Sequence, residues 1–243
     1  MPTQRKPDTL AEVAYQRMRS IILRGELPLG SPVLRRKLAG QFGMSLVPVA
    51  AALQRLEAEG LVESRPRSGT RVRIPTPQEI RGHYIVREAL ESQAARLFAE
   101  MATMRKRAEL MKMAKQVDAM YTSSPLVRLD RAKRLYEIHE QHLLFHVRIA
   151  QSTGCRELIS AIGKNQILIF QWLYNSAAHF DTLPPRWHQD LVEALASGDP
   201  EKADQAMRLH VRFRRDEVAE RIRAYLVAND SARTGFRGTR AAE

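Results

Sequence analysis

The chain has 243 residues, with 39 Lys and Arg against 27 Asp and Glu, which gives a formal net charge of +12. The hydrophobic fraction of 44% and the charged fraction of 27% are ordinary for a globular protein and exclude a disordered chain. No apolar run approaches the ~18 residues of a membrane span, and the single cysteine, Cys155, excludes an internal disulfide and a cysteine-based zinc site. We therefore expect an intracellular, cytoplasmic protein that has no membrane partner.

The positive charge is concentrated in the N-terminal part of the chain. Residues 1–75 carry 13 basic and 6 acidic side chains, whereas residues 76–243 carry 26 and 21. Phosphate contacts require Lys and Arg, so the first segment is the candidate for binding a polyanion such as double-stranded DNA. A merely solvated basic surface is the alternative.

The first 74 residues predict three helices followed by a basic hairpin. Apolar residues recur at helical spacing, and Ser31-Pro32 has the residue types that open a helix, as does Ser45. The helices are expected near residues 10–24, 31–42 and 45–59, and the strands at residues 61–64 and 70–74. This order is that of a winged helix-turn-helix domain, 1–74, whose third helix enters the DNA major groove and whose basic loop is the wing.

The rest of the chain is predicted to be helical throughout. Two prolines at alternate positions, Pro75 and Pro77, predict a hinge at 75–77. Apolar spacing predicts helices near residues 77–103, 105–122, 126–152, 155–179, 184–197 and 200–228. We expect an all-α helical bundle at 78–230 that binds a metal and an effector and forms the dimer, followed by a polar, flexible tail at 231–243.

Several stretches carry a resemblance to a known family. They are the run Ile22 to Gly30, the run Leu53 to Val62, the wing glycine Gly69, and Val86 to Glu91. The chain resembles GntR-family transcription regulators of the FadR subgroup, which carry an FCD effector domain, over nearly all of residues 9–228. The resemblance implies a mostly α fold and a bacterial repressor or activator. Such a regulator binds a near-palindromic operator as a homodimer and is switched by a small ligand.

The expected recognition helix departs from the family pattern. The family reads Ser-Arg-x-Pro-Val-Arg-x-Ala-Leu there, whereas this chain has Leu46 and Ala50 in place of the two arginines. An arginine that reads guanine is worth about 1–3 kcal/mol of base discrimination. The sequence therefore predicts either an altered operator, with thymine-methyl contacts from Leu46 or Ala50, or a loss of specificity. An exposed Leu46 of no consequence is the alternative.

The expected DNA contacts come from three places. The start of the second helix supplies phosphate contacts, the third helix reads bases, and the wing touches phosphate or the minor groove. The candidate residues are Arg35, Arg36, Lys37, Ser45, Leu46, Val47, Ala50, Arg65, Arg67 and Gly69. Solvated loop charge is the alternative for the wing arginines.

Four histidines form the second candidate site. His142 and His146 are four residues apart and share one helix face, which suits chelation of one ion. The resemblance implies the ligand pattern Asp-x-x-x-His, His, His. His146, His188 and His210 match it, and His142 replaces the aspartate. Imidazoles alone favour zinc or nickel, so we expect a divalent ion of that type, whose retention falls as pH drops through about 6–7. A cluster that binds no metal is the alternative.

Two more residues adjoin this site. Arg87 matches a family position that faces the ligand pocket, where a guanidinium would grip a small organic-acid effector by its carboxylate. A surface salt bridge with Glu91 is the alternative for Arg87. His139 lies on the same helix face as His142, and we favour a helix-surface position for it over a role behind the ligands.

Two rival functions remain open at this point. A metal-dependent enzyme is the first, but no nucleophile elbow, phosphate loop or zinc-protease motif is found, so we expect no enzyme. The second is a regulator that has lost operator specificity and acts as a metal- or ligand-sensing interaction protein.

Overall fold

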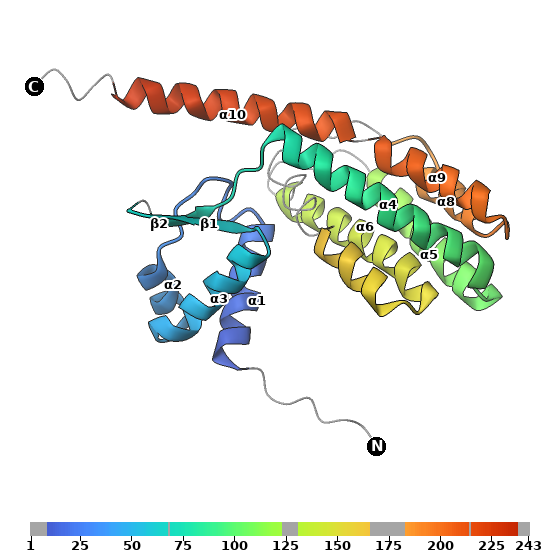
Figure 1. Ribbon diagram of the computed structural model, residues 1–243, viewed down its shortest axis with the longest axis horizontal. Helices are drawn as coiled ribbons and strands as arrows, with labels where there is room; N and C mark the ends of the chain where they lie inside the picture. Colours follow the sequence, from blue (N-terminus) through green and yellow to red (C-terminus); the bar gives the residue numbers. More distant parts are fainter. Residues whose placement is uncertain (1–8, 68, 123–130, 166–182, 214, 238–243) are drawn as a thin grey trace, which may run out of the picture. The chain divides into compact units, whose positions relative to one another are not determined.

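The computed structural model describes residues 9–67, 69–122, 131–165, 183–213 and 215–237. The chain divides into two compact units, Met1–Ile74 and Pro75–Glu243 (Figure 1). No helix among the described residues is both long enough and apolar enough to span a membrane.

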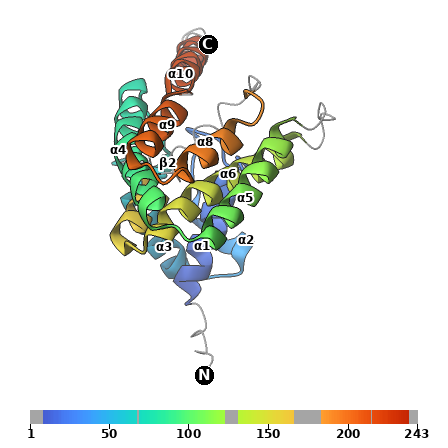
Figure 2. The same cartoon turned by 90° about the vertical axis from the view of Figure 1, so that its right-hand side faces the viewer.

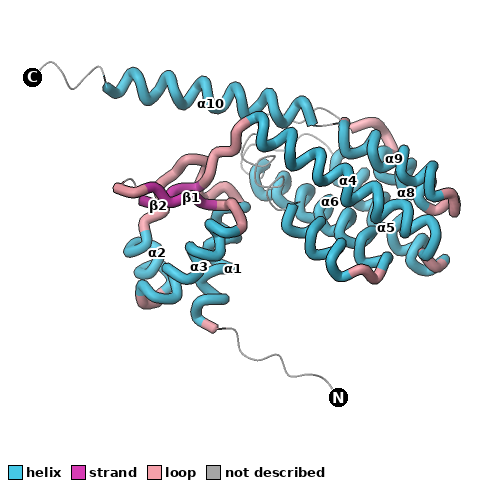
Figure 3. Tube along the Cα trace, viewed as in Figure 1, coloured by secondary structure: helices cyan, strands magenta, loops and turns pink. Residues whose placement is uncertain are grey.

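The described residues of the first unit form three helices and one hairpin (Figure 3). The elements are α1 Leu10–Leu23, α2 Arg35–Phe42, α3 Leu46–Ala58, β1 Val62–Arg65 and β2 Gly69–Val72. Helix α1 packs against α3 through buried side chains that include Met18, Ile22, Val49 and Leu56. The strands pair in antiparallel register, with Val62 opposite Val72. The unit is a winged helix-turn-helix, as the sequence predicts.

The second helix begins later than the sequence predicts. Ser31 and Pro32 do not open α2, because their backbone pairs with the hairpin instead. The Val33 N–H donates to the Thr70 carbonyl at 2.8 Å, and the Val72 N–H donates to the Ser31 carbonyl at 3.0 Å. Pro32 forms an isolated antiparallel bridge with Arg71. The prediction of a helix start at Ser31-Pro32 is therefore wrong, since an extended segment there satisfies the edge of β2.

The second unit is an all-helical bundle. Its helices are α4 Pro77–Met101, α5 Met104–Thr122, α6 Arg131–Thr153, α8 Trp187–Leu195, α9 Pro200–Arg212 and α10 Arg215–Arg237, and residues 156–165 are also helical. Helix α4 lies against α6, α9 and α10, and α5 lies against α6 and α8 (Figures 1 and 2). Tyr84, Phe98, Phe145, Ile149 and Met207 are among the buried core residues. This confirms the predicted fold class.

Three boundaries differ from expectation. At the expected hinge, Thr76 is the N-cap of α4 in a capping box with Glu79, and Pro77 is its first residue, so these residues begin a helix. The helix expected at 200–228 is divided into α9 and α10. Helix α10 runs to Arg237, through residues expected in the tail. Residues 126–130 and 166–179, where helices were also expected, lie outside the described part.

Candidate functional site: a histidine-lined pocket

Three histidines from two helices converge inside the second unit. His142 and His146 lie on α6 and His210 lies on α9, and one ligand nitrogen from each lies within 4.8 Å of the others. The Nε2 atoms of His142 and His146 are 3.0 Å apart. Two nitrogens that share one zinc ion at ~2.1 Å are separated by about 3.0–3.4 Å, so this spacing suits a common ion.

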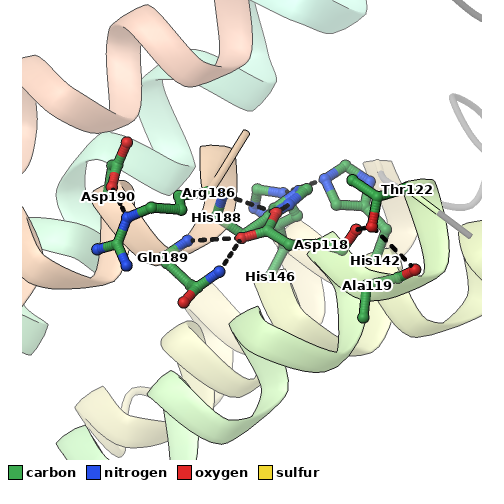
Figure 4. A network of polar contacts seen from close by, with 9 residues as sticks. All are labelled: Asp118, Ala119, Thr122, His142, His146, Arg186, His188, Gln189 and Asp190. Atoms are coloured by element: carbon green, nitrogen blue, oxygen red, sulfur yellow. Dashed lines mark hydrogen bonds and ion pairs between the residues drawn. The ribbon is translucent and has the colours of Figure 1, made fainter. Parts of the chain in front are cut away.

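His188 lies beside these three rings. It is fully buried, and its ring centre lies 5.0 Å from that of His142 and 5.1 Å from that of His210. Its Nδ1 lies 2.6 Å from Oδ1 of Asp118 on α5 (Figure 4). Because a carboxylate only accepts, Nδ1 carries the proton and Nε2 carries the lone pair. That Nε2 is buried and has no hydrogen-bond partner among the described residues.

Asp118 also caps helix α8. Its Oδ1 accepts the backbone N–H of His188 at 3.1 Å, and its Oδ2 accepts the backbone N–H of Gln189 at 3.1 Å. The N-cap residue Arg186 provides no side-chain cap. Burial raises the pKa of Asp118, but the hydrogen bonds from His188 and Gln189 outweigh it and the net pKa is lowered. One carboxylate thus fixes both the start of α8 and the orientation of the His188 ring.

A second carboxylate serves His146. Glu91 Oε2 lies 2.7 Å from His146 Nδ1, and Glu91 Oε1 accepts from Arg87 Nε at 2.9 Å. The Arg87 Nη2 lies 3.1 Å from His146 Nε2. The Arg87–Glu91 ion pair considered from the sequence therefore exists, but it is buried and not on the surface, with exposed fractions of 4% and 2%. Burial raises the pKa of Glu91, yet Arg87 and His146 outweigh it and lower that pKa to about 2.

The electrostatics keep two ligand candidates neutral. Burial, reinforced by the neighbouring histidines and Arg87, lowers the pKa of His142 well below its ordinary value. Burial also lowers the pKa of His146, although Glu91 acts in the opposite direction. A metal ion needs the unprotonated imidazole, so at neutral pH these rings are in the form that binds.

These side chains border a pocket. Arg87, His142, His188 and His210 line it together with Tyr84 and Trp187. His139 lines it as well and is only 3% exposed, so the expectation of a helix-surface position for His139 is wrong. The pocket combines nitrogen donors that suit a metal with a guanidinium that suits an anion.

The DNA-contact candidates of the first unit are largely exposed. At the start of α3, Leu46 is 48% exposed and Val47 is 77% exposed, and the N-cap Ser45 makes no side-chain capping bond. Ala50 is half-buried, and Arg35 donates to Thr70 Oγ1 at 3.3 Å, which ties it to the wing strand. The remaining candidates, all exposed, are Arg36, Lys37, Arg65, Arg67 and Gly69.

Sequence reasoning missed two functional positions at the pocket. Asp118 has no motif and lies 70 residues before His188 in the chain. Glu91 entered only as a surface partner for Arg87. The one signal available for Glu91 was its spacing of four residues from Arg87, whereas nothing local marks Asp118.

A winged helix-turn-helix unit together with a helical unit that holds a histidine-lined pocket is typical of a ligand-responsive transcription regulator. Family models agree with both units. The model "Bacterial regulatory proteins, gntR family" matches residues 10–72, and the FCD domain model matches residues 83–213. The chain belongs to the GntR family and carries an FCD domain.

Relatives extend along most of the chain. The protein named "Probable D-xylose utilization operon transcriptional repressor" from Paenarthrobacter nicotinovorans is 32% identical over 193 residues, which cover 78% of this chain and 80% of that protein. The HTH-type transcriptional repressor RspR of Escherichia coli K12 is 25% identical over 213 residues, which cover 86% of this chain and 87% of that protein. The families and relatives are transcription regulators and not enzymes, which sets the enzyme alternative aside.

Solved structures share the fold. A GntR transcriptional regulator from Rhodococcus sp. RHA1 superposes with a TM-score of 0.69 at 18% identity, covering 86% of this chain and 96% of that one. McbR/YncC of Escherichia coli superposes with a TM-score of 0.67 at 20% identity, covering 90% of this chain and 99% of that one.

Proposed function

We propose that the protein is a bacterial, ligand-responsive transcription regulator whose DNA affinity is set by a metal-containing pocket in its FCD domain. A homodimer presents two winged units to a near-palindromic operator in this proposal. The family and the fold support the DNA-binding role. The pocket supports the response to a ligand, because the histidine rings and the guanidinium of Arg87 line one common space.

The proposed metal ligands are His142, His146, His188 and His210. The observation that carries this set is the buried Nε2 of His188, which has no hydrogen-bond partner among the described residues while Asp118 fixes its tautomer. An unpaired buried acceptor costs about 1–3 kcal/mol, and a bound cation would remove that cost. Four imidazoles without a carboxylate favour zinc or nickel over harder ions.

The proposed effector is a small organic acid. Arg87 borders the same pocket as the histidines, and its guanidinium can hold a carboxylate through two parallel hydrogen bonds. The metal, when bound, would supply a Lewis-acidic position for an effector oxygen. Arg87 would orient the acid, and the ligand would shift DNA affinity only if it binds one arrangement of the protein better than the other.

The proposed operator differs from that of relatives with arginines in the recognition helix. The start of α3 offers exposed apolar surface at Leu46 and Val47, with Ala50 half-buried one turn on. We propose contacts with thymine methyl groups there, with positioning by phosphate contacts from Arg36, Lys37 and the wing.

Elemental analysis of protein never exposed to chelator tests the metal site. Stoichiometric zinc or nickel is expected, and His188→Gln should lose most of it. His83→Gln is the matched control, because His83 pairs with Asn165 at 2.8 Å and is outside the cluster. Less than about a tenth of an equivalent in the unmodified protein would contradict the proposal, given how tightly such sites hold metal.

A further inference from the structure

Both ring nitrogens of His146 have close neighbours. Nδ1 lies 2.7 Å from Glu91 Oε2. Nε2 lies 3.1 Å from Arg87 Nη2 and 3.0 Å from Nε2 of His142, the second proposed ligand on α6. A neutral imidazole that carries its proton on Nδ1, the nitrogen beside the Glu91 carboxylate, has one lone pair, which is on Nε2. A guanidinium carries only donors, so the contact between Arg87 and His146 uses that lone pair.

The guanidinium is firmly held in this position. Its Nε donates to Glu91 Oε1 at 2.9 Å, and its central carbon lies 5.7 Å from the centre of the Tyr84 ring. Arg87, Glu91 and His146 are all buried. With one positive and one negative charge and a neutral ring, the three residues balance their charges without any further cation.

We propose that Arg87 is an internal competitor for the metal position: its guanidinium occupies the His146 lone pair and leaves before that nitrogen binds an ion. The inference rests on the proposed metal site. A ligand that binds only the fraction of molecules in which Arg87 has left His146 shows an affinity reduced by that fraction. The pocket therefore has a weaker metal affinity than its four histidines alone would give.

The competition also links the two proposed ligands of the pocket. Arg87 borders the pocket, so a guanidinium that leaves His146 becomes available to an anion there. A carboxylate that holds Arg87 away from His146 frees the lone pair, and by linkage each ligand strengthens the binding of the other. The same side chain thereby makes the metal and the organic acid cooperate.

The test compares Zn²⁺ affinity in charge-matched variants of the full chain, measured by competition with a chromophoric chelator. Arg87→Met alone is ambiguous, because it leaves the charge of Glu91 beside the site. The double variant Arg87→Met with Glu91→Gln removes one charge of each sign and keeps an acceptor oxygen available to His146 Nδ1. The control is Arg96→Met with Glu201→Gln, which removes a more exposed pair at 2.6 Å that also starts from α4.

We expect the Arg87/Glu91 double variant to bind Zn²⁺ about 10- to 100-fold more tightly than the unmodified protein, the range that one buried hydrogen bond from a charged donor sets. The control pair should leave the affinity unchanged. Equal or weaker binding in the double variant overturns the inference while leaving the metal site standing. Absence of Zn²⁺ binding in every variant overturns the metal site as well.

A second measurement uses the unmodified protein and does not depend on the folding of the Arg87/Glu91 double variant. In a nitrogen-15 arginine spectrum of the unmodified protein, the Nε–H signal of Arg87, assigned by its loss in Arg87→Lys, should move on addition of Zn²⁺. An unmoved signal in protein that has bound Zn²⁺ shows that Arg87 keeps its position, which overturns the inference.

Discussion

At the scale of single residues, the orientation of His188 depends on a carboxylate that lies 70 residues earlier in the chain. Asp118 accepts from the ring Nδ1 at 2.6 Å and from two backbone N–H groups at the start of α8. These contacts favour one orientation of the His188 ring, so we infer that Asp118 is a positioning residue for the proposed metal site.

Asp118→Asn should lower Zn²⁺ affinity about 10- to 100-fold, because the amide removes the charge that fixes the His188 tautomer and places an N–H against a donor. It should also reduce the free energy of unfolding by about 1–2 kcal/mol through the weakened cap of α8. Asp190→Asn is the control, since Asp190 lies in the first turn of α8 and its side chain is 60% exposed. Unchanged Zn²⁺ affinity in Asp118→Asn would contradict this role.

The buried histidines predict a pH dependence of stability in the metal-free protein. Burial, then neighbouring charge, lowers the pKa of His142 below the ordinary value of 6.5, so the unfolded chain takes up a proton that the folded chain refuses. The stability from this residue is therefore complete above about pH 6.5 and declines as pH falls below it. Glu91, whose pKa is lowered from 4.5 to about 2, adds a second decline below pH 4.5.

Urea denaturation between about pH 7 and pH 5 measures the first decline, and His142→Gln should make it shallower. A stability that rises as pH falls through this window would contradict the burial argument. The same lowered pKa values move the expected loss of metal to more acidic pH than the range of about 6–7 that unperturbed histidines predict.

At the scale of elements, the ends of α4 and α8 are held by one arginine of α5. Arg107 donates to the carbonyls of Ala99, Ala102 and Ala196 at 3.1, 3.0 and 2.7 Å. These carbonyls lie at helix ends, where a carbonyl has no N–H partner within its own helix. The side chain therefore joins three helices through their backbone.

Arg107→Met should lower the free energy of unfolding by about 2–3 kcal/mol, because it leaves helix-end carbonyls without a donor. Arg105→Met is the matched control, since Arg105 is exposed on the same turn of α5. Urea denaturation measures both, and equal stabilities of the two variants would contradict the assignment.

The start of α3 predicts what the protein reads in DNA. Leu46→Arg restores one family arginine at a position 48% exposed, so the fold should tolerate it. The sequence selected from random DNA by Leu46→Arg should then contain an additional guanine in each half-site. Replacing that guanine by another base should weaken binding by about 1–3 kcal/mol. Leu10→Arg, at an exposed position of α1, adds the same charge and should not change the selected sequence. If Leu46→Arg leaves the selected sequence and the affinity unchanged, the thymine-methyl proposal is wrong.

Local pattern predicted those elements whose signals lie within the element itself. The buried face of α3, with Val49, Ala52 and Leu56, follows from helical spacing. The start of α2 did not, because Ser31 and Pro32 are used by a strand about 40 residues later. The division of α9 from α10 also lacks a glycine or proline at residues 213–215 that would indicate it.

The candidate site shows the same limit. The spacing of His142 and His146 was visible in the sequence, and the structure brings His210 and His188 beside them. The partners that orient these rings come from other helices, Glu91 from α4 and Asp118 from α5. Tertiary packing decides such contacts, and no spacing within one helix encodes them.

At the scale of the whole molecule, charge and chemistry are divided between the two units. The excess of basic side chains in residues 1–75 predicts a general affinity of the winged unit for phosphate, which would depend on salt and not on DNA sequence. In the proposed function, specificity comes from α3 and the wing, and regulation comes from the pocket. The proposed function therefore requires that this protein recognise a particular DNA sequence.

Selection of genomic fragments on the purified protein tests this sequence recognition. The affinities for the enriched fragment and for scrambled DNA are then measured at two salt concentrations. We expect a motif with two-fold symmetry whose binding survives about 150 mM salt and exceeds that of scrambled DNA by more than about 10³-fold. Absence of any enriched motif, with binding that simply disappears as salt rises, would contradict it and leave the N-terminal unit a nonspecific binder of polyanions.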